Sequence, residues 1–274
     1  MNNFIVFICT HGRPYEQITL KMLRDCGYTG LIILVVDNED NTRYLLDDYK
    51  GRRTDYWTFN KQYHIKIDDS GTDTPIRNTH LYAWNACESF AKLFDCQYYA
   101  IMDDDLTSFR YRYEEDGHLK SQTITQNMDK VFDAYIDYLK ATDIACLSIA
   151  DARNYIGGQA KDGRNMNTVI FRNGKHEFKW HSEMYEEMAT SITYQQRGDF
   201  IFQPTFMQYE TKTMAKNVKG GMEEIYKSQS IFRRAAYTVM YHPDCVSFDA
   251  NNTGFKLKKD NAFPKLIGFK HKLL

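Results

Sequence analysis

The sequence has few of the features that mark a secreted, membrane-bound or modular protein. Its 5 prolines are scattered and no stretch is rich in serine and glycine, so no linker between domains is evident. No apolar run approaches the roughly 20 residues that a membrane-spanning helix needs. The apolar residues 5–9 are too few for a secretion signal and no basic residue precedes them. The six cysteines follow no CxxC or Cys/His zinc pattern, which favours free thiols in a reducing cytoplasm. We therefore expect a cytoplasmic protein that does not contact a membrane.

The composition is typical of an ordered globular protein. Hydrophobic residues make up 43% of the chain and aromatic residues 15%, which is enough for a large core and leaves no sign of a disordered tail. A chain of 274 residues fits one large domain or two small ones, and without a linker we expect a single domain over residues 1–274. The net charge of −1 conceals an uneven distribution, because six lysines and only one acid follow Asn251.

Three groups of polar residues follow short apolar runs that are typical of buried strands. They are Thr10 to Arg13 after the run at 4–9, Asp37 and Asn38 after the run at 31–36, and Asp103 to Asp105 after the run at 98–102. Helices are expected between these runs, and this β-α-β-α order predicts an α/β fold with a mainly parallel sheet. Ligands bind such sheets at the carboxyl ends of the strands, so the three polar groups are expected to share one site.

The rest of the chain is expected to continue the alternation of helices and strands. Helices are predicted over 14–25, 42–49, 76–94, 127–140, 183–197 and 228–241, further strands over 63–67, 144–149 and 200–202, and a β-hairpin around Asn173-Gly174 over 169–180. Thr74 and Pro75 would cap the helix that begins at Ile76. Arg77 would then lie near the positive end of this helix, where phosphate binds, although a solvated arginine is the alternative.

Asp103, Asp104 and Asp105 form the most distinctive group. Three carboxylates at the end of one strand repel one another, and each needs solvent, a proton or a cation. A divalent metal ion would relieve this repulsion most directly, because such ions prefer carboxylate oxygens as ligands. The alternative is an acidic turn that contains a helix cap.

Several short motifs together carry a family resemblance. They are C-T-H-G-R-P at 9–14, V-V-D-N at 35–38, Arg77-Asn78 and M-D-D-D at 102–105, in this order. With them the chain resembles an inverting glycosyltransferase of the GT-A, family-2-like kind, whose members typically carry T-x-N-R-P, V-V-D, A-R-N and L-D-x-D. That family often has an acidic pair opening a helix that ends in glycine before a short strand. Here Glu186-Glu187 are followed by Gly198 and the apolar residues 200–202, so the resemblance covers roughly residues 4–203.

The resemblance implies a GT-A-like, nucleotide-binding α/β/α sandwich with a mainly parallel sheet. The nucleotide-sugar would bind in a first half of about residues 1–110, and the acceptor in a mixed second half of about residues 111–274. The residues that would bind the donor, expected to be a UDP-sugar, are Thr10, Arg13, Asp37, Arg77, Asp103 and Asp104. The chain departs from the family pattern where His11-Gly12 replaces an aromatic-Asn pair and where Asn38 replaces an Asp.

The resemblance also implies how the transfer is catalysed. The residues that would hold Mn²⁺ or Mg²⁺ are Asp103, Asp105 and, as a candidate third ligand, His242. Asp104 would only orient its neighbours. A divalent cation neutralises the charge that collects on the diphosphate when the sugar leaves, and an inverting transfer needs a base for the acceptor's proton. Glu187 stands where the family has this base, but it is one methylene longer than the usual Asp, so Glu186 is the alternative base.

The acceptor is indicated by basic residues that alternate with aromatic ones in the second half. They are Lys212 to Lys219, Arg233, Arg234 and the C-terminal lysines, with Phe232, Tyr237, Phe255 and Phe269 among them. This pattern suits a polyanion such as DNA, and ordinary solvated surface is the alternative. The chain also resembles the bacteriophage glycosyltransferases that decorate hydroxymethylated pyrimidines in DNA, which would place it in the host cytoplasm. Trp180 or Tyr185 would then help to extract the target base from the stack. A saccharide acceptor is the main alternative.

Two other classes of protein share parts of this pattern. A nucleotidyltransferase also uses clustered aspartates and a nucleotide, but it usually has a Gly-rich phosphate loop, of which only Gly12-Arg13 remains here. A non-catalytic nucleic-acid-binding module on an inactive GT-A scaffold would keep the basic residues and lose the metal-dependent binding of nucleotides.

Overall fold

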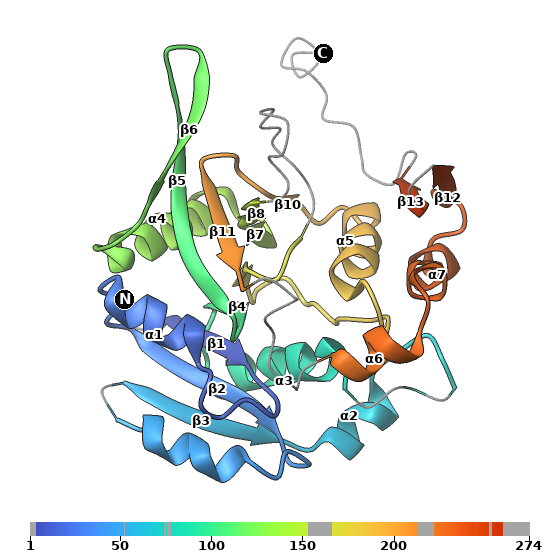
Figure 1. Ribbon diagram of the computed structural model, residues 1–274, viewed down its shortest axis with the longest axis horizontal. Helices are drawn as coiled ribbons and strands as arrows, with labels where there is room; N and C mark the ends of the chain where they lie inside the picture. The colour runs from blue at the N-terminus through green and yellow to red at the C-terminus, as the bar shows by residue number, and fades with distance from the viewer. Residues whose placement is uncertain are drawn as a thin grey trace.

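Seven strands form the central sheet of the protein. In the computed structural model, which describes residues 4–51, 53–73, 75, 78–152, 166–212, 222–251 and 254–259, the strand order is β10-β7-β9-β4-β1-β2-β3 (Figure 1). The strands are β1 (Phe4–Cys9), β2 (Leu31–Asp37), β3 (Thr54–Phe59), β4 (Tyr98–Asp103), β7 (Cys146–Ser148), β9 (Ile170–Asn173) and β10 (Ile201–Phe202). Neighbours run parallel except at β9, which is antiparallel to both β4 and β7. The predicted α/β fold with a mainly parallel sheet is confirmed.

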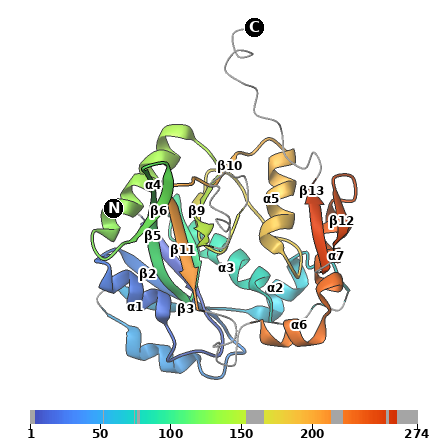
Figure 2. The ribbon, with the colours of Figure 1, turned by 45° about the horizontal axis from the view of Figure 1, so that its top comes forward.

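Helices cover both faces of this sheet (Figures 1 and 2). They are the 3-10 helix η1 (Arg43–Tyr49) and the α-helices α1 (Ile18–Asp25), α2 (Lys61–Ile67), α3 (His80–Leu93), α4 (Met128–Thr142), α5 (Glu186–Gln196), α6 (Glu223–Ser228) and α7 (Ile231–Tyr241). Val6 and Ile8 of β1 are buried together with residues of α1 and α4, whereas Ile5 and Phe7 are buried with residues of α3. This three-layer packing explains why β1 is apolar throughout, because both of its faces lie in the core. None of the described helices is long and apolar enough to span a membrane.

The register of the central strands brings their polar ends together. Cys9 pairs with Val35 on one side and with Asp103 on the other. The residues that follow β1, β2 and β4 therefore emerge at the same edge of the sheet, as the sequence predicted.

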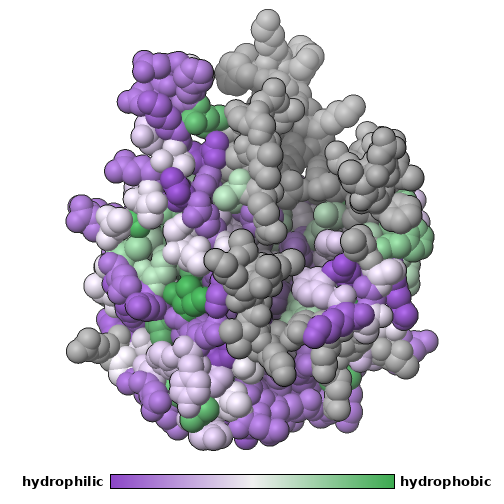
Figure 3. All heavy atoms as spheres, in the orientation of Figure 1, coloured by the Kyte–Doolittle hydropathy of each residue, from purple (hydrophilic) through white to green (hydrophobic). Residues whose placement is uncertain are grey.

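A second, smaller sheet has the order β6-β5-β11-β8. It consists of β5 (Leu106–Glu115), β6 (His118–Thr123), β8 (Ala150–Asp151) and β11 (Met207–Thr211). The hairpin of β5 and β6 extends away from the body of the protein, and its tip is hydrophilic (Figures 1 and 3). A third sheet, β12 (Val246–Asn251) with β13 (Gly254–Lys259), lies beside α7. These additions give the second half of the chain the mixed character that was expected.

Several local predictions were wrong because contacts distant in sequence decided the structure. The predicted strand over 63–67 is part of helix α2, whose first turn is capped by the Asn60 side chain. Helix α3 begins at His80 rather than at Ile76. The Thr79 hydroxyl caps the helix there, because it accepts a hydrogen bond from the backbone amide of Leu81. The predicted hairpin around Asn173-Gly174 is also wrong. Both edges of β9 already pair with β4 and β7, so residues 177–180 cannot add a strand to it.

Two predictions about side chains and loops have different outcomes. All six cysteines are buried with free thiols, as predicted. The C-terminal lysines after Lys259 and most of the basic segment from Lys212 to Lys219 lie outside the described residues.

Candidate active site

The three polar strand ends meet in one cavity of about 830 Å³. The predicted site residues that line it are Thr10, Arg13, Asp37, Asp103, Asp104, Asp105, Glu186 and Glu187. Arg77 lies outside the described residues, although its neighbour Asn78 lines the cavity. The acidic start of α5 thus faces the aspartates that follow β4, as the spacing of the motifs indicated.

Asp104 holds the loop after β1 against the end of β4. Its two carboxylate oxygens accept hydrogen bonds from the Thr10 hydroxyl at 2.7 Å and from the Arg13 guanidinium at 3.0 Å. Gln17 in turn donates to the Thr10 hydroxyl at 2.9 Å. Asp104 is 4% exposed, and burial raises its pKa although Arg13 opposes the rise. Since both of its oxygens are engaged, this carboxylate is placed to orient the loop.

Thr19, at the start of α1, fixes the backbone of the aspartate turn. Its hydroxyl donates to the carbonyl of Asp103 at 2.6 Å and accepts from the amide of Leu106 at 2.9 Å. Its own amide donates to the carbonyl of Asp104 at 3.0 Å. This role could not be predicted, because Thr19 lies inside a helical pattern and its partners come from a different part of the chain.

Asp103 and Asp105 are the carboxyl groups that suit a cation. Burial raises the pKa of Asp103 to about 7, and the neighbouring Asp105 and Asp104 add to the rise while His80 opposes it. One carboxylate oxygen of Asp103 is buried and finds no hydrogen-bond partner within the part of the chain that the structure describes. The pKa of Asp105 is also raised, chiefly by burial. A crowded set of carboxylates with an unpartnered oxygen fits a divalent cation, which would satisfy that oxygen and remove the repulsion.

Asp37 also lines the cavity, but its surroundings differ from those of the aspartates after β4. It contacts the His11 imidazole at 2.6 Å and the Lys61 ammonium at 3.4 Å, and it accepts from the amide of Glu39 at 3.0 Å. Burial alone would raise the pKa of Asp37, but these partners outweigh it and lower that pKa. Lys61 is 3% exposed and also donates to Asn78 at 2.8 Å. Asp37 is therefore a fixed, ionised acceptor, suited to hydroxyl or N–H groups of a ligand.

The two acids at the start of α5 have distinct surroundings. Glu186 is 2% exposed and contacts the His80 imidazole at 3.3 Å. Burial alone would lower the pKa of His80, but Asp103 and Glu186 outweigh it and raise that pKa to about 10. Burial raises the pKa of Glu187 to about 8, and Glu186 adds to the rise. Glu186 is thus paired with a cation, whereas Glu187 is the acid whose pKa lies near neutrality, as a general base requires.

A buried ion pair joins β9 to α3, the helix that begins at His80. Arg172 of β9 contacts Glu88 of α3 at 3.0 Å, and the indole N–H of Trp180 donates to the same carboxylate at 3.2 Å. Trp180 is fully buried, so the prediction that it extracts a base from DNA was wrong. Tyr185, the other candidate, is half-buried and lines the cavity.

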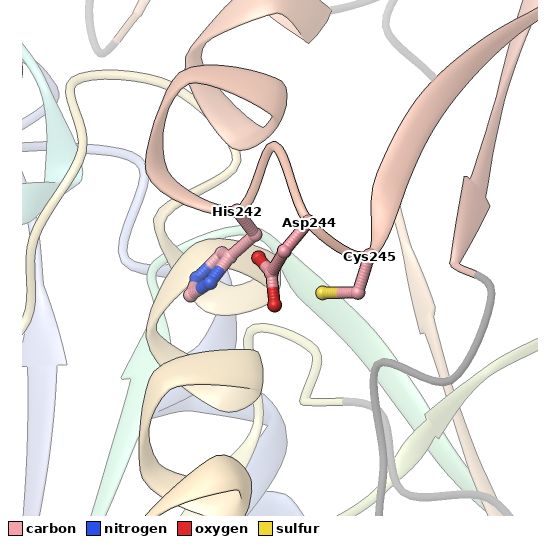
Figure 4. Close-up of side chains that lie close together, drawn as sticks. All are labelled: His242, Asp244 and Cys245. Atoms are coloured by element: carbon pink, nitrogen blue, oxygen red, sulfur yellow. The ribbon is translucent and has the colours of Figure 1, made fainter.

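The structure does not bring His242 to the aspartates. His242 is not among the residues that line the cavity, and its Nε2 lies 2.8 Å from the carbonyl oxygen of Ala189 in α5. Figure 4 shows it beside Asp244 and Cys245 at the end of α7. The prediction of a metal shared with Asp103 and Asp105 is therefore corrected, because α7 ends against the middle of α5 rather than at its acidic start.

Lys61 and His80 are site residues that sequence reasoning missed. Lys61 was hidden by the wrong strand over 63–67, and His80 by the expected helix from Ile76. Both residues stand at the start of a helix in the segment between β3 and β4 of the central sheet.

With the site described, comparison with known proteins defines its class. The family described as TET-Associated Glycosyltransferase matches residues 4–221, so this chain is a member of a glycosyltransferase family. Specifically, it belongs to the TET-associated glycosyltransferases. No curated protein matched the sequence.

Among solved structures, the chain is similar to one described as GalNAc-T7 with UDP, GalNAc and Mn²⁺. The similarity has a TM-score of 0.49 at 10% sequence identity, and it covers 76% of this chain and 43% of the other. The matched region thus spans less than half the length of that protein.

Proposed function

We propose that this protein transfers a sugar from a nucleoside-diphosphate sugar to the hydroxyl of a hydroxymethylated pyrimidine in DNA. The observation that carries the proposal is the meeting, in one cavity, of an ionised Asp37, the crowded aspartates after β4 and a second acidic pair on α5. A glycosyltransferase needs a nucleoside site, a diphosphate site and a base, and these three groups have the matching chemistry.

The nucleoside of the donor is assigned to the end of the cavity around Asp37. Its carboxylate would accept hydrogen bonds from the base or the ribose, and His11 and Lys61 keep it ionised. Thr10 and Arg13 line the same wall, but both bond to Asp104 and so shape the pocket. We expect a UDP-sugar as the donor.

The diphosphate is assigned to the neighbourhood of Asp103 and Asp105. These residues would hold Mn²⁺ or Mg²⁺, which when bound neutralises the negative charge on the diphosphate. The unpartnered oxygen of Asp103 supports this assignment. Asp104 is left to its two hydrogen bonds and has a positioning role.

The transfer itself is assigned to Glu187 as general base. Its carboxylate takes the proton of the acceptor hydroxyl while that oxygen forms a bond to the anomeric carbon of the sugar. The bond from this carbon to the diphosphate oxygen breaks, and the nucleoside diphosphate leaves with the electron pair. A single displacement of this kind inverts the anomeric configuration. Glu186 is less suited to the role because His80 engages it.

The DNA acceptor is supported by the sequence resemblance, by the family and by the charge at the cavity. The sequence resembles bacteriophage enzymes that glycosylate hydroxymethylated pyrimidines, and the family name associates these glycosyltransferases with TET. In addition, Arg233 is exposed and Arg234 lines the cavity beside the acidic start of α5. Positive charge at the cavity suits a nucleic-acid strand.

The test is a transfer assay read by mass spectrometry of the acceptor. The purified protein is incubated with Mn²⁺, a panel of UDP-sugars and an oligonucleotide that contains 5-hydroxymethylcytosine or 5-hydroxymethyluracil. We expect the mass of one sugar residue to be added to the modified oligonucleotide and none to the same sequence with ordinary pyrimidines. Transfer to saccharide acceptors alone would overturn the assignment of the acceptor. Release of pyrophosphate from nucleoside triphosphates, without any sugar transfer, would overturn the assignment of the reaction.

A further inference from the structure

One wall of the cavity is built by residues that have no role in the reaction described above. Met222 and Tyr226 come from the region of α6, and Arg234 comes from α7. Figures 1 and 2 place α6 next to α7, on the side of the protein where α5 lies. This wall therefore adjoins the acidic start of α5.

Helix α6 is anchored by a small apolar cluster. Ile225 is fully buried and Met222 is 7% exposed, and both pack with Met184 and Tyr237. Met184 lies just before the acidic pair of α5, so the cluster fixes α6 relative to Glu187. In contrast to the buried Ile225, the next residue, Tyr226, has 42% of its surface exposed. An aromatic ring that is held on a rigid base and left accessible in a cavity is suited to contact a ligand.

Arg234 lies over the ring of Tyr226. The centre of its guanidinium is 4.8 Å from the centroid of the ring, a distance at which the cation and the aromatic face attract each other. The Nε of Arg234 is buried and has no hydrogen-bond partner among the described residues. A buried donor without a partner is uncommon in proteins, and a ligand oxygen would satisfy it.

Tyr226 lines the same cavity as Glu187, and the apolar cluster under α6 includes Met184, three residues before Glu187. Burial raises the pKa of Tyr226, and the carboxylates of Glu186, Glu187 and Asp103 add to the rise in that order. The acceptor hydroxyl must approach Glu187, and the Tyr226 ring lines the cavity in which this approach takes place.

We propose that Tyr226 and Arg234 form the subsite for the acceptor nucleotide. The pyrimidine base stacks on the ring of Tyr226, and the guanidinium of Arg234 donates hydrogen bonds to a phosphate oxygen of the same nucleotide. This inference rests on the proposed transfer to DNA and assigns the residues that recognise the acceptor.

The chemistry of both side chains fits a nucleotide. Stacking on an aromatic side chain is favourable for every base, because each base has a flat π face. Arginine keeps its charge at all relevant pH values, and its planar group matches the geometry of a phosphate. Lys227 on α6 and Arg233 on α7 are exposed and add positive charge to these two helices. A target base that has left the duplex would thus be held next to Glu187.

The test compares the steady-state kinetics of Tyr226→Ala, Tyr226→Phe and Arg234→Met on an oligonucleotide with one hydroxymethylated pyrimidine. Loss of stacking should raise KM for the oligonucleotide about 5- to 150-fold in Tyr226→Ala, the equivalent of ~1–3 kcal/mol. Tyr226→Phe keeps the ring and should stay within about threefold of the wild type. Arg234→Met should raise the same KM and make it less sensitive to salt, because one phosphate contact is lost. The affinity for UDP, measured by calorimetry, should be unchanged in all three variants.

The matched control is Tyr138→Ala, which removes a tyrosine of nearly the same exposure, 43%, from α4 outside the cavity. Its KM for the oligonucleotide should equal that of the wild type. A wild-type KM in Tyr226→Ala, or a loss of UDP affinity instead, would overturn the subsite while leaving the proposed function intact. Failure of the wild type to modify this DNA would overturn both. A saccharide that is a better acceptor, and whose KM rises in Tyr226→Ala, would overturn the assignment to a nucleotide.

Discussion

The buried pair of Arg172 and Glu88 gives the sharpest prediction about the scaffold. The Arg172 side chain is fully buried and donates to Glu88 at 3.0 and 3.5 Å, to the Ala145 carbonyl at 2.5 Å and to the His176 carbonyl at 3.0 Å. It also lies 4.0 Å from the centroid of the Phe178 ring. Replacing Arg172 by methionine keeps much of the apolar bulk but leaves the Glu88 charge buried without its cation.

The expected cost follows from this geometry. Breaking a buried ion pair by removing one partner destabilises a protein by about 3–5 kcal/mol, whereas replacing both partners costs much less. Arg172→Met should therefore lower the free energy of unfolding by about 3–5 kcal/mol. The double variant Glu88→Gln with Arg172→Met should recover a large part of that loss. With the single variant Glu88→Gln, the four proteins form a double-mutant cycle that gives the coupling of the two side chains.

Urea denaturation followed by tryptophan fluorescence measures these values. The control is Lys175→Met, which removes an ion pair with Asp143 whose side chains are 62% and 56% exposed. Exposed pairs contribute about 0–1 kcal/mol, so this variant should be close to the wild type. If Arg172→Met is no less stable than Lys175→Met, the pair does not support the fold in the way described.

Three further predictions concern the site. Asp37→Asn should reduce the free energy of unfolding at pH 7 by about 1.5–3 kcal/mol. Because the pKa of Asp37 is lowered in the folded protein, the wild type loses this stability as the pH falls below about 4. The free energies of unfolding of the two proteins, measured against pH, should therefore converge there. Glu187→Gln should lower kcat about 10²- to 10⁴-fold. The wild-type rate should fall as the pH drops below about 8, because Glu187 becomes protonated there. A pH-independent rate would exclude Glu187 as the base. Asp104→Asn should retain more transfer activity than Asp105→Asn, because Asp104 is already engaged by hydrogen bonds; equal losses in the same assay would contradict the separate roles.

The parts of the fold that were predictable have strong local signals. The strands β1, β2 and β4 are uninterrupted apolar runs that end in polar residues, and their order in the chain implies a parallel sheet. The strand β3 was missed because it lies at the edge of the sheet, where four of its six residues are not fully buried. The strands β5 and β6 were missed because most of their side chains are exposed and polar, so neither forms an apolar run in the sequence.

The candidate site was predictable only where its residues stand directly after such strands. Asp37 and the three aspartates could be recognised in this way, and the acidic pair of α5 through the spacing of a family motif. Lys61, His80 and Tyr226 could not, because each acquires its role from partners on other elements. For His242 the error was the opposite one, because a role in the site was predicted where there is none. Histidine is a residue type suited to metal binding, but the end of α7 places His242 beside Ala189 rather than beside the aspartates.

Calorimetric titration of UDP in the presence and absence of Mn²⁺ tests the central claim most directly. The wild type should bind UDP with Mn²⁺ and at least about tenfold more weakly without it, a loss of about 1.4 kcal/mol or more. Asp105→Asn should abolish the effect of the metal. The control Asp116→Asn, on the exposed hairpin at a positive φ of 54° that asparagine tolerates, should behave as the wild type. Equal affinity for UDP with and without the metal, or an Asp105→Asn variant that binds as the wild type does, would contradict a metal-dependent donor site at these aspartates.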